Sequence, residues 1–201
     1  MSSLADRFSS FPLIAILRGL PPTHAVDVGK ALYKVGFRMV EVPLNREHAL
    51  ESIELLASHL PNDCIVGAGT VLTTEDVKAV KAAGGQLVVS PNVNPEVITL
   101  TRNCSMISLP GIATPTEAFN AIEAGAHGLK VFPASSYGFD HLKALTTVLP
   151  QNTPLIAVGG VTLDNYPQWL FAGAKAVGIG SDIFKTGDSL SDVEQRLNLH
   201  F

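Results

Sequence analysis

Short runs of apolar and β-branched residues recur at even spacing along the whole chain. The runs are LIAILR (13–18), MVEVPL (39–44), CIVGAGT (64–70), LVVSP (87–91), MISLPG (106–111), GLKVFPA (128–134), LIAVGG (155–160) and AVGIGS (176–181). Within each run the apolar positions are nearly continuous rather than alternating, which is typical of strands that are covered on both faces. The pattern therefore predicts eight buried parallel strands.

The segments between these runs carry the signals of helix starts and ends. Segments 73–84, 114–125 and 162–173 each begin with a threonine, have an acidic residue within the next three positions, and end in glycine. A hydroxyl cap, acids in the first turn and a closing glycine predict a helix in each segment. Strands that alternate with helices indicate an α/β protein.

Two architectures fit this alternation, a closed (β/α)8 TIM barrel and an open doubly wound sheet. No Gly-x-Gly-x-x-Gly follows the first run, which weakens the dinucleotide-binding form of the open sheet. The count of eight and the even spacing favour closure. We therefore predict a single (β/α)8 barrel domain over residues 1–201, shorter than the usual length of about 250 residues.

Composition limits the partners of such a domain. Charged residues make up 16% of the chain and hydrophobic residues 46%, which predicts both a two-sided core and burial of surface against copies of the same chain. The net charge of −4 argues against nucleic-acid binding, because no basic stripe is present to contact phosphates. No run approaches the ~18 apolar residues of a membrane span, so we expect no membrane partner and a cytoplasmic location.

Cysteine and histidine show no pattern of a metal site. Cys64 and Cys104 lie in apolar surroundings and are predicted to be buried, inert thiols. None of the six histidines falls at the end of a predicted strand, and no His-x-x-x-His pair or Cys/His cluster occurs. We expect neither a metal nor another cofactor.

Four polar residues interrupt the apolar runs near their C-terminal ends, which is where TIM barrels carry their chemistry. They are Arg18, Glu41, Thr70 and Lys130. If their strand faces point into the barrel, the four side chains converge on one cavity. The alternative is a buried ion network of Arg18, Glu41 and Lys130 that only holds the barrel together, although such networks stabilise weakly.

Strand alternation assigns each of these residues to a face. Lys130 shares its face with Phe132, and Glu41 shares its face with Pro43. By the same rule Thr70 lies on the face of Ala68.

A lysine in an apolar slot predicts a specific reaction. Burial or a neighbouring cation lowers the pKa of an amine from about 10.4 and makes it nucleophilic. An imine on Lys130 would provide an electron sink for cleavage of an adjacent C–C bond. Glu41 is the carboxylate available to move the proton.

The last two runs end in small residues, at the place where this fold commonly binds phosphate. Gly159 and Gly160 end the seventh run, and Gly180 and Ser181 end the eighth. We expect a short helix to begin near Ser181. Asp182 is expected to cap this helix and to face away from a bound phosphate.

The chain also resembles a known family in several segments that keep their order and spacing. These segments are LIAILRG, VEVPLN, GAGTVL, SPN, LPGIATPTEA, EAGAHGLKVFPAS and AVGGVT. Together they resemble the class I KDPG/KHG aldolases, and the resemblance covers nearly the whole chain. It implies a homotrimeric, metal-free barrel lyase that cleaves a phosphorylated 2-keto-3-deoxy sugar acid into pyruvate and glyceraldehyde 3-phosphate.

The resemblance also implies roles for individual residues. Lys130 would form the Schiff base and Glu41 would transfer protons. Arg18 and Thr70 would bind the substrate's carboxylate end, and Gly159, Gly160, Gly180 and Ser181 would surround the phosphate. Pro91 and Phe132, from the SPN and KVFPA segments, complete the predicted substrate-binding residues.

One departure bears on the substrate. The phosphogluconate branch usually carries Glu-x-Thr-Leu-Arg, whereas this chain has Glu41-Val42-Pro43-Leu44-Asn45. The departure favours the phosphogalactonate branch, and phosphogluconate cleavage by the same residues is the nearest alternative. A phosphate-binding barrel isomerase or synthase with Glu41 as its base, and a non-catalytic sugar-phosphate binder, are the others.

Overall fold

A computed structural model describes residues 4–201 of the chain. The strands are β1 (Leu13–Ile16), β2 (Met39–Pro43), β3 (Ile65–Gly69), β4 (Leu87–Val89), β5 (Ile107–Leu109), β6 (Gly111–Ile112), β7 (Leu129–Val131), β8 (Leu155–Val158) and β9 (Ala176–Ile179). The helices are α1 (Leu4–Ser10), α2 (Pro22–Lys34), α3 (Ala49–His59), α4 (Thr74–Ala82), α5 (Pro95–Asn103), α6 (Pro115–Glu123), α7 (Ala134–Val148), α8 (Tyr166–Phe171) and α9 (Leu190–His200).

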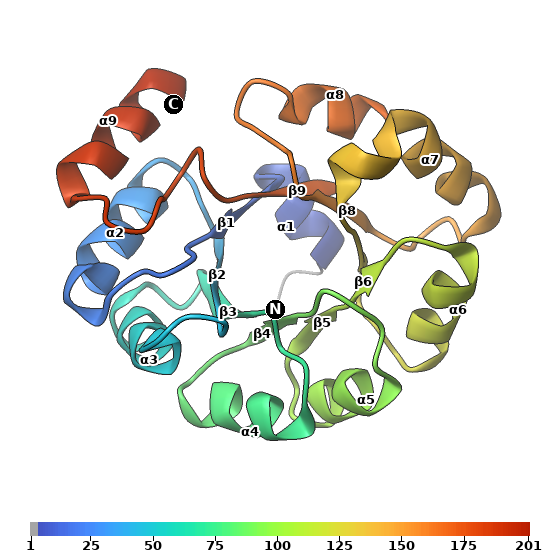
Figure 1. The fold of residues 1–201 in the computed structure, drawn as a ribbon, viewed down its shortest axis with the longest axis horizontal. Helices are drawn as coiled ribbons and strands as arrows, with labels where there is room; N and C mark the ends of the chain where they lie inside the picture. Colours follow the sequence, from blue (N-terminus) through green and yellow to red (C-terminus); the bar gives the residue numbers. More distant parts are fainter. Residues whose placement is uncertain (1–3) are drawn as a thin grey trace.

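The strands form a parallel barrel surrounded by the helices, which confirms the predicted TIM barrel (Figure 1). β1 pairs with β2 on one side and with β9 on the other, so the first and last strands are neighbours. The fifth predicted run differs from expectation, because it is divided into β5, paired with β4, and β6, paired with β7. Pro110 lies between the two halves, so the chain itself joins these two edges of the sheet.

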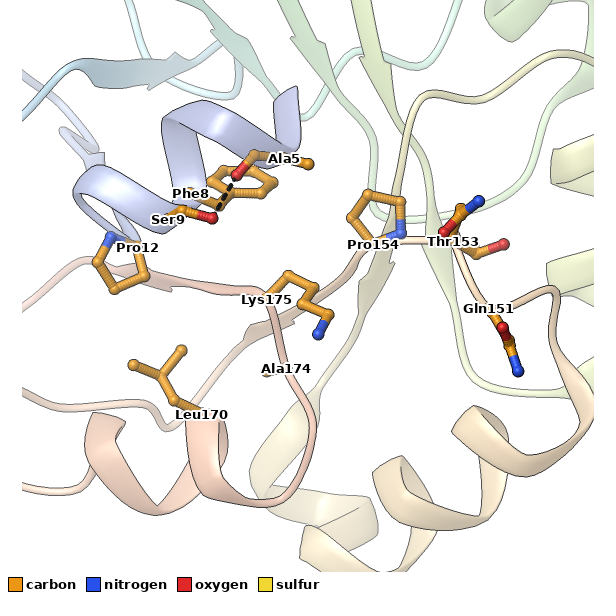
Figure 2. Close-up of a pocket in the computed structure, with 11 residues that line it drawn as sticks. Ala5, Phe8, Ser9, Pro12, Gln151, Thr153, Pro154, Leu170, Ala174 and Lys175 are labelled. Atoms are coloured by element: carbon orange, nitrogen blue, oxygen red, sulfur yellow. Dashed lines mark hydrogen bonds between the residues drawn. The ribbon is translucent and has the colours of Figure 1, made fainter. Parts of the chain in front are cut away.

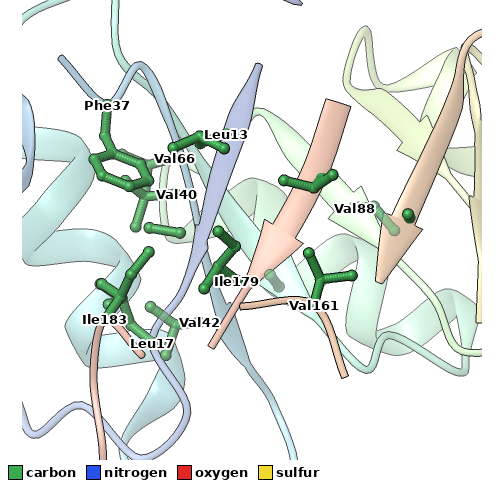
Figure 3. Close-up of a cluster of buried hydrophobic side chains, with 14 of the residues drawn as sticks. Leu13, Leu17, Phe37, Val40, Val42, Val66, Val88, Val161, Ile179 and Ile183 are labelled. Carbon is green, nitrogen blue, oxygen red and sulfur yellow. The ribbon is translucent and has the colours of Figure 1, made fainter. Parts of the chain in front are cut away.

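Two apolar layers lie on opposite sides of the strands. Val40, Val66 and Ile179 pack outward against the helices in the larger cluster (Figure 3). Met39, Ile65 and other alternate strand residues pack together in the smaller cluster, which fills the barrel interior. Strand residues are therefore apolar on both faces, as their near-continuous patterning predicts.

The structure confirms two of the three predicted helix starts. Thr73 and Thr114 each accept a hydrogen bond from the N–H three residues on and complete a capping box. Gly84, which follows the first of these helices, has a φ of +81° that L-residues rarely adopt. In the third segment, Thr162 and Asn165 instead exchange hydrogen bonds within a turn, and α8 begins only at Tyr166.

The N-terminal end of the barrel is closed by α1, a helix that the sequence patterns do not predict. Its Phe8 is 4% exposed and belongs to the interior cluster. At the other terminus of the chain, α9 packs beside α2 (Figure 1). Within residues 4–201, no helix is both long enough and apolar enough to cross a bilayer.

Candidate active site

A pocket of about 410 Å³ opens at the C-terminal ends of the strands. All ten predicted site residues line it: Arg18, Glu41, Thr70, Pro91, Lys130, Phe132, Gly159, Gly160, Gly180 and Ser181. They come from seven of the eight predicted runs, which lie far apart in the sequence and meet only because the barrel closes. The roles of these residues stay predictions.

Lys130 lies in the middle of β7, on the face that points into the barrel. Its side chain is buried, and Nζ lies 4.4 Å from the centroid of the Phe132 ring. Burial lowers the pKa of Lys130, the Glu41 carboxylate opposes this shift, and the Arg18 guanidinium adds to it. The surroundings therefore favour the neutral, nucleophilic amine.

Glu41 points into the same pocket from β2 and is 3% exposed. Burial raises its pKa to about 7, although Lys130 and Arg18 both act in the opposite direction. Its Oε2 is buried and has no hydrogen-bond partner among the described residues. An unpaired buried carboxylate oxygen is costly for folding, which makes it a candidate for a group that acts on a ligand.

Gly69 makes the room for this carboxylate. A Cβ at position 69 would lie only 1.5 Å from Glu41 Oε2, since β3 runs directly beside β2. The second glycine of the GAGT segment, Gly69, is therefore required because the Glu41 side chain approaches so closely.

The structure does not contain the ion network that the sequence left open. Among residues 4–201, no ion pair joins Glu41 to Lys130 or to Arg18. Arg18 is exposed at the mouth of the pocket, after the end of β1. The pocket thus holds an amine with a lowered pKa and a carboxyl with a raised pKa, close enough to influence each other, with a cation at the rim.

Thr70 reaches the pocket by a route that strand alternation does not predict. Ala68, assigned to the same face, belongs to the outer cluster against the helices, so the alternation argument is wrong here. Thr70 adopts a left-handed φ of 57°, which turns the chain and directs the residue to the pocket. Two hydrogen bonds of the next residue, Val71, hold this turn in place. Val71 N–H donates to Val89 C=O, and Val71 C=O accepts from Ser90 Oγ at 2.7 Å.

The glycine-rich side of the pocket also differs from expectation. No helix begins near Ser181, and the described chain enters its next helix only at Leu190. Instead, Gly180 C=O accepts hydrogen bonds from the N–H groups of Ile183 and Phe184, which form a single turn. Asp182 therefore caps no helix, but its carboxylate accepts a hydrogen bond from Leu163 N–H at 2.9 Å.

Several residues that line the pocket were missed by the sequence analysis. Lys185 and Thr186 follow the turn at Ser181, and Thr162 follows the glycine pair. No strand-end signal marks Lys185, because it lies five residues beyond the glycine of the eighth run. Its proximity in sequence to the expected phosphate site is the one signal that could have found it.

The two cysteines differ in burial. Cys64 is buried, and burial raises the pKa of its thiol to about 11, as expected of an inert thiol. Cys104 is only half-buried, so the expectation of burial is wrong for this residue. Within residues 4–201, no group of three or more His, Cys, Asp or Glu side chains has the arrangement of a metal site.

A second cavity, of about 520 Å³, lies at the opposite end of the barrel (Figure 2). It is bounded by Phe8 and Ser9 of α1 and by residues that precede β8 and β9. Lys175 is the only ionisable side chain among the described residues that line it. This cavity lacks a paired acid and base, so the C-terminal pocket is the better candidate.

Comparison with protein families identifies relatives along nearly the whole chain. Residues 4–195 match the family described as KDPG and KHG aldolase. A protein of Rhizobium meliloti (strain 1021), named a probable 2-dehydro-3-deoxy-6-phosphogalactonate aldolase, is 47% identical over 185 residues. That alignment covers 92% of this chain and 87% of the relative.

Solved structures agree with this result. A structure described as native KDPGal is 44% identical, has a TM-score of 0.90, and aligns over 93% of this chain and 91% of its own. The KDPG aldolase of Legionella pneumophila, with pyruvate captured at low pH as a covalent carbinolamine, is 26% identical with a TM-score of 0.86. That alignment covers 99% of this chain and 98% of the Legionella protein.

Proposed function

Because this chain belongs to the KDPG and KHG aldolase family, we propose that it cleaves 2-dehydro-3-deoxy-6-phosphogalactonate to pyruvate and glyceraldehyde 3-phosphate. The enzyme is a carbon–carbon lyase of class I, which forms a Schiff base with its substrate and uses no metal. The phosphogalactonate preference is supported by relatives at 44–47% identity, compared with 26% for the Legionella KDPG aldolase.

One observation carries the proposed chemistry. An amine with a lowered pKa and a carboxyl with a raised pKa are both buried in one pocket, and no ion pair within residues 4–201 neutralises either. Environments that shift the pKa values of two groups toward neutrality are suited to nucleophilic and acid–base work near pH 7. The covalent pyruvate adduct of the Legionella relative supports the same chemistry.

The reaction follows from these two groups. The neutral amine of Lys130 attacks C2 of the keto acid, and loss of water gives the iminium. Glu41 takes the C4 hydroxyl proton as C3–C4 breaks, and the electron pair of that bond moves toward the iminium to form an enamine. Glyceraldehyde 3-phosphate leaves. The enamine is then protonated at C3, and hydrolysis releases pyruvate and the free amine.

The remaining pocket residues bind the two ends of the substrate. Arg18 at the rim anchors the carboxylate through charge-assisted hydrogen bonds, and Thr70 lies at the same end. Gly159, Gly160, Gly180 and Ser181 surround the phosphate. Pro91 and Phe132 provide apolar walls between the two ends.

The decisive experiment traps the imine. Incubation of the enzyme with pyruvate and borohydride should reduce the imine to a stable secondary amine, which mass spectrometry locates on Lys130. An unmodified Lys130, or modification spread over surface lysines, would exclude the imine route. That result would instead favour an isomerase or synthase in which Lys130 acts only as a cation.

The substrate branch needs its own measurement. The two C4-epimeric substrates, the 6-phosphogalactonate and 6-phosphogluconate forms, differ only in the C4 configuration. We expect a higher kcat/KM for the galactonate epimer. A preference for the gluconate epimer would keep the mechanism and overturn the substrate assignment.

We also propose that the enzyme is a homotrimer that works in the cytoplasm. Phe171 is 89% exposed on α8, and Phe119 and Leu72 are also exposed, which leaves apolar surface for contacts between copies. Light scattering coupled to size-exclusion chromatography measures the oligomer, and fractionation of the source cells measures the location.

A further inference from the structure

We infer that Lys185 supplies the positive charge for the phosphate end of the substrate. This inference rests on the proposed function and adds to it a residue outside the segments that carry the family resemblance. The ionisable side chains among the described residues that line the pocket are Arg18, Glu41, Lys130 and Lys185.

The charges of the substrate require another cation. A phosphate monoester carries about −1.5 to −2 charges near pH 7, in addition to the carboxylate. Lys130 is neutral when it attacks, and the positive charge of the iminium that follows lies at C2, beside the carboxylate and away from the phosphate at C6. Glu41 adds no positive charge. Arg18 is assigned to the carboxylate. Lys185 is therefore the lining residue left to balance the phosphate.

The position of Lys185 follows from the turn at the end of β9. Gly180 C=O accepts from Ile183 and Phe184 N–H, so the chain turns back immediately after Ser181. Lys185 directly follows this turn, four residues beyond Ser181. Both residues line the pocket.

Hydrogen bonds to two other parts of the chain hold the segment that carries Lys185. Thr186 Oγ1 donates to Arg18 C=O at 3.1 Å, which ties the segment to the loop after β1. Lys185 N–H donates to Asp188 Oδ2 at 2.6 Å. Arg196 of α9 in turn donates to both carboxylate oxygens of Asp188, at 2.6 and 2.8 Å.

The two acids that flank Lys185 in the sequence have other hydrogen-bond partners. Asp188 is engaged by Arg196, and Asp182 accepts from Leu163 N–H. Among residues 4–201, no carboxylate forms an ion pair with the Lys185 ammonium. The Lys185 side chain is exposed, and its charge acts on Asp188 without a close ion pair, so the ammonium can bind an anion from a main chain that is fixed beside the pocket.

The test compares substrates with and without the phosphate. In Lys185→Gln, KM for 2-dehydro-3-deoxy-6-phosphogalactonate should rise roughly ten-fold, the effect of losing one solvent-exposed charge-assisted contact. KM for the unphosphorylated 2-dehydro-3-deoxygalactonate should stay within about two-fold, and kcat should change little. Lys185→Arg should restore most of the affinity. Equal rises for both substrates, or no rise, would overturn the inference.

Lys175→Gln is the matched control, since it removes an exposed lysine at the other end of the barrel. It should leave both KM values unchanged. Borohydride trapping of pyruvate on Lys130 should persist in Lys185→Gln, because pyruvate has no phosphate. If the wild-type enzyme itself gives no trapped adduct on Lys130, that result would instead contradict the proposed aldolase function.

A binding measurement tests the role of Lys185 even if the protein shows no aldolase activity. Glycerol 3-phosphate has no carbonyl group and cannot form an imine, and its affinity can be measured by NMR titration. The affinity should fall roughly ten-fold in Lys185→Gln, and remain at the wild-type value in Lys175→Gln. An unchanged affinity in Lys185→Gln would overturn the inference independently of catalysis.

Discussion

The two ends of the barrel differ in whether their polar groups are paired. At the N-terminal end, Asp63 accepts from Tyr33 Oη at 2.9 Å and from Arg38 Nε at 3.0 Å. The Arg38 guanidinium also lies 3.8 Å from the centroid of the Tyr33 ring. At the C-terminal end, in the part of the chain that the structure describes, Glu41 Oε2 is buried with no hydrogen-bond partner and Lys130 is buried without an ion pair.

This difference separates stability from function within one fold. Paired groups and the buried Phe8 of α1 cover the N-terminal end, so that end contributes to folding. Unpaired buried groups at the C-terminal end oppose folding, and they persist because the surrounding barrel holds them in place. Substitutions at the two ends should therefore have opposite effects on activity and stability.

The largest effect on activity is expected at Lys130. Lys130→Met keeps the apolar stem and removes the amine, so turnover should fall by on the order of 10⁴-fold or more. Circular dichroism and thermal unfolding should show an intact fold, because the lost group has no ion pair to break. Residual turnover near the wild-type level would show that the amine is not the nucleophile.

Glu41 should have the next largest effect and should set the pH dependence. Glu41→Gln should lower kcat by about 10²- to 10⁴-fold, the usual contribution of a general acid–base group. Glu41 must be ionised to accept the C4 proton, so the wild-type rate should fall as the pH decreases through about 7. The pH–rate profile of the variant should lack this limb, and a retained limb at about 7 would assign it to another group.

Gly69 tests whether the position of Glu41 matters. In Gly69→Ala the new Cβ would lie 1.5 Å from Glu41 Oε2, so the carboxylate must move. We expect kcat to fall by on the order of 10²-fold, as for other small displacements of catalytic groups. Ala68→Gly, on the outward face of the same strand, is the control and should keep kcat near the wild-type value.

Phe8 tests the other end of the barrel. Phe8→Ala removes a buried ring from the interior cluster and should lower the free energy of unfolding by about 3–5 kcal/mol. The kcat measured below the unfolding transition should not change. Ser9→Ala, an exposed change in the same helix, should stay within about 0.5 kcal/mol of wild type. Denaturant unfolding and steady-state kinetics provide both measurements.

The smallest effect is expected from chelation. A Schiff-base mechanism needs no Lewis acid, so treatment with a chelator should leave kcat/KM unchanged. A loss of activity that zinc restores would contradict the metal-free mechanism.

The sequence by itself determined the barrel and most of the pocket lining. Near-continuous apolar runs predict strands buried on both faces, and a charged residue inside such a run, as at Lys130 or Glu41, stands out because its burial is costly. This local signal needs no knowledge of long-range contacts. It was sufficient to select residues that prove to lie together.

Only the tertiary structure decided how several of these residues reach the pocket. Thr70 depends on a left-handed turn fixed by Ser90, and the room beside Glu41 depends on the approach of β3 to β2. The position of Lys185 depends on the hydrogen bond from Thr186 Oγ1 to Arg18 C=O, which joins residues 168 positions apart in the sequence. Such contacts form between distant segments, and residue periodicity describes only what neighbours along the chain share.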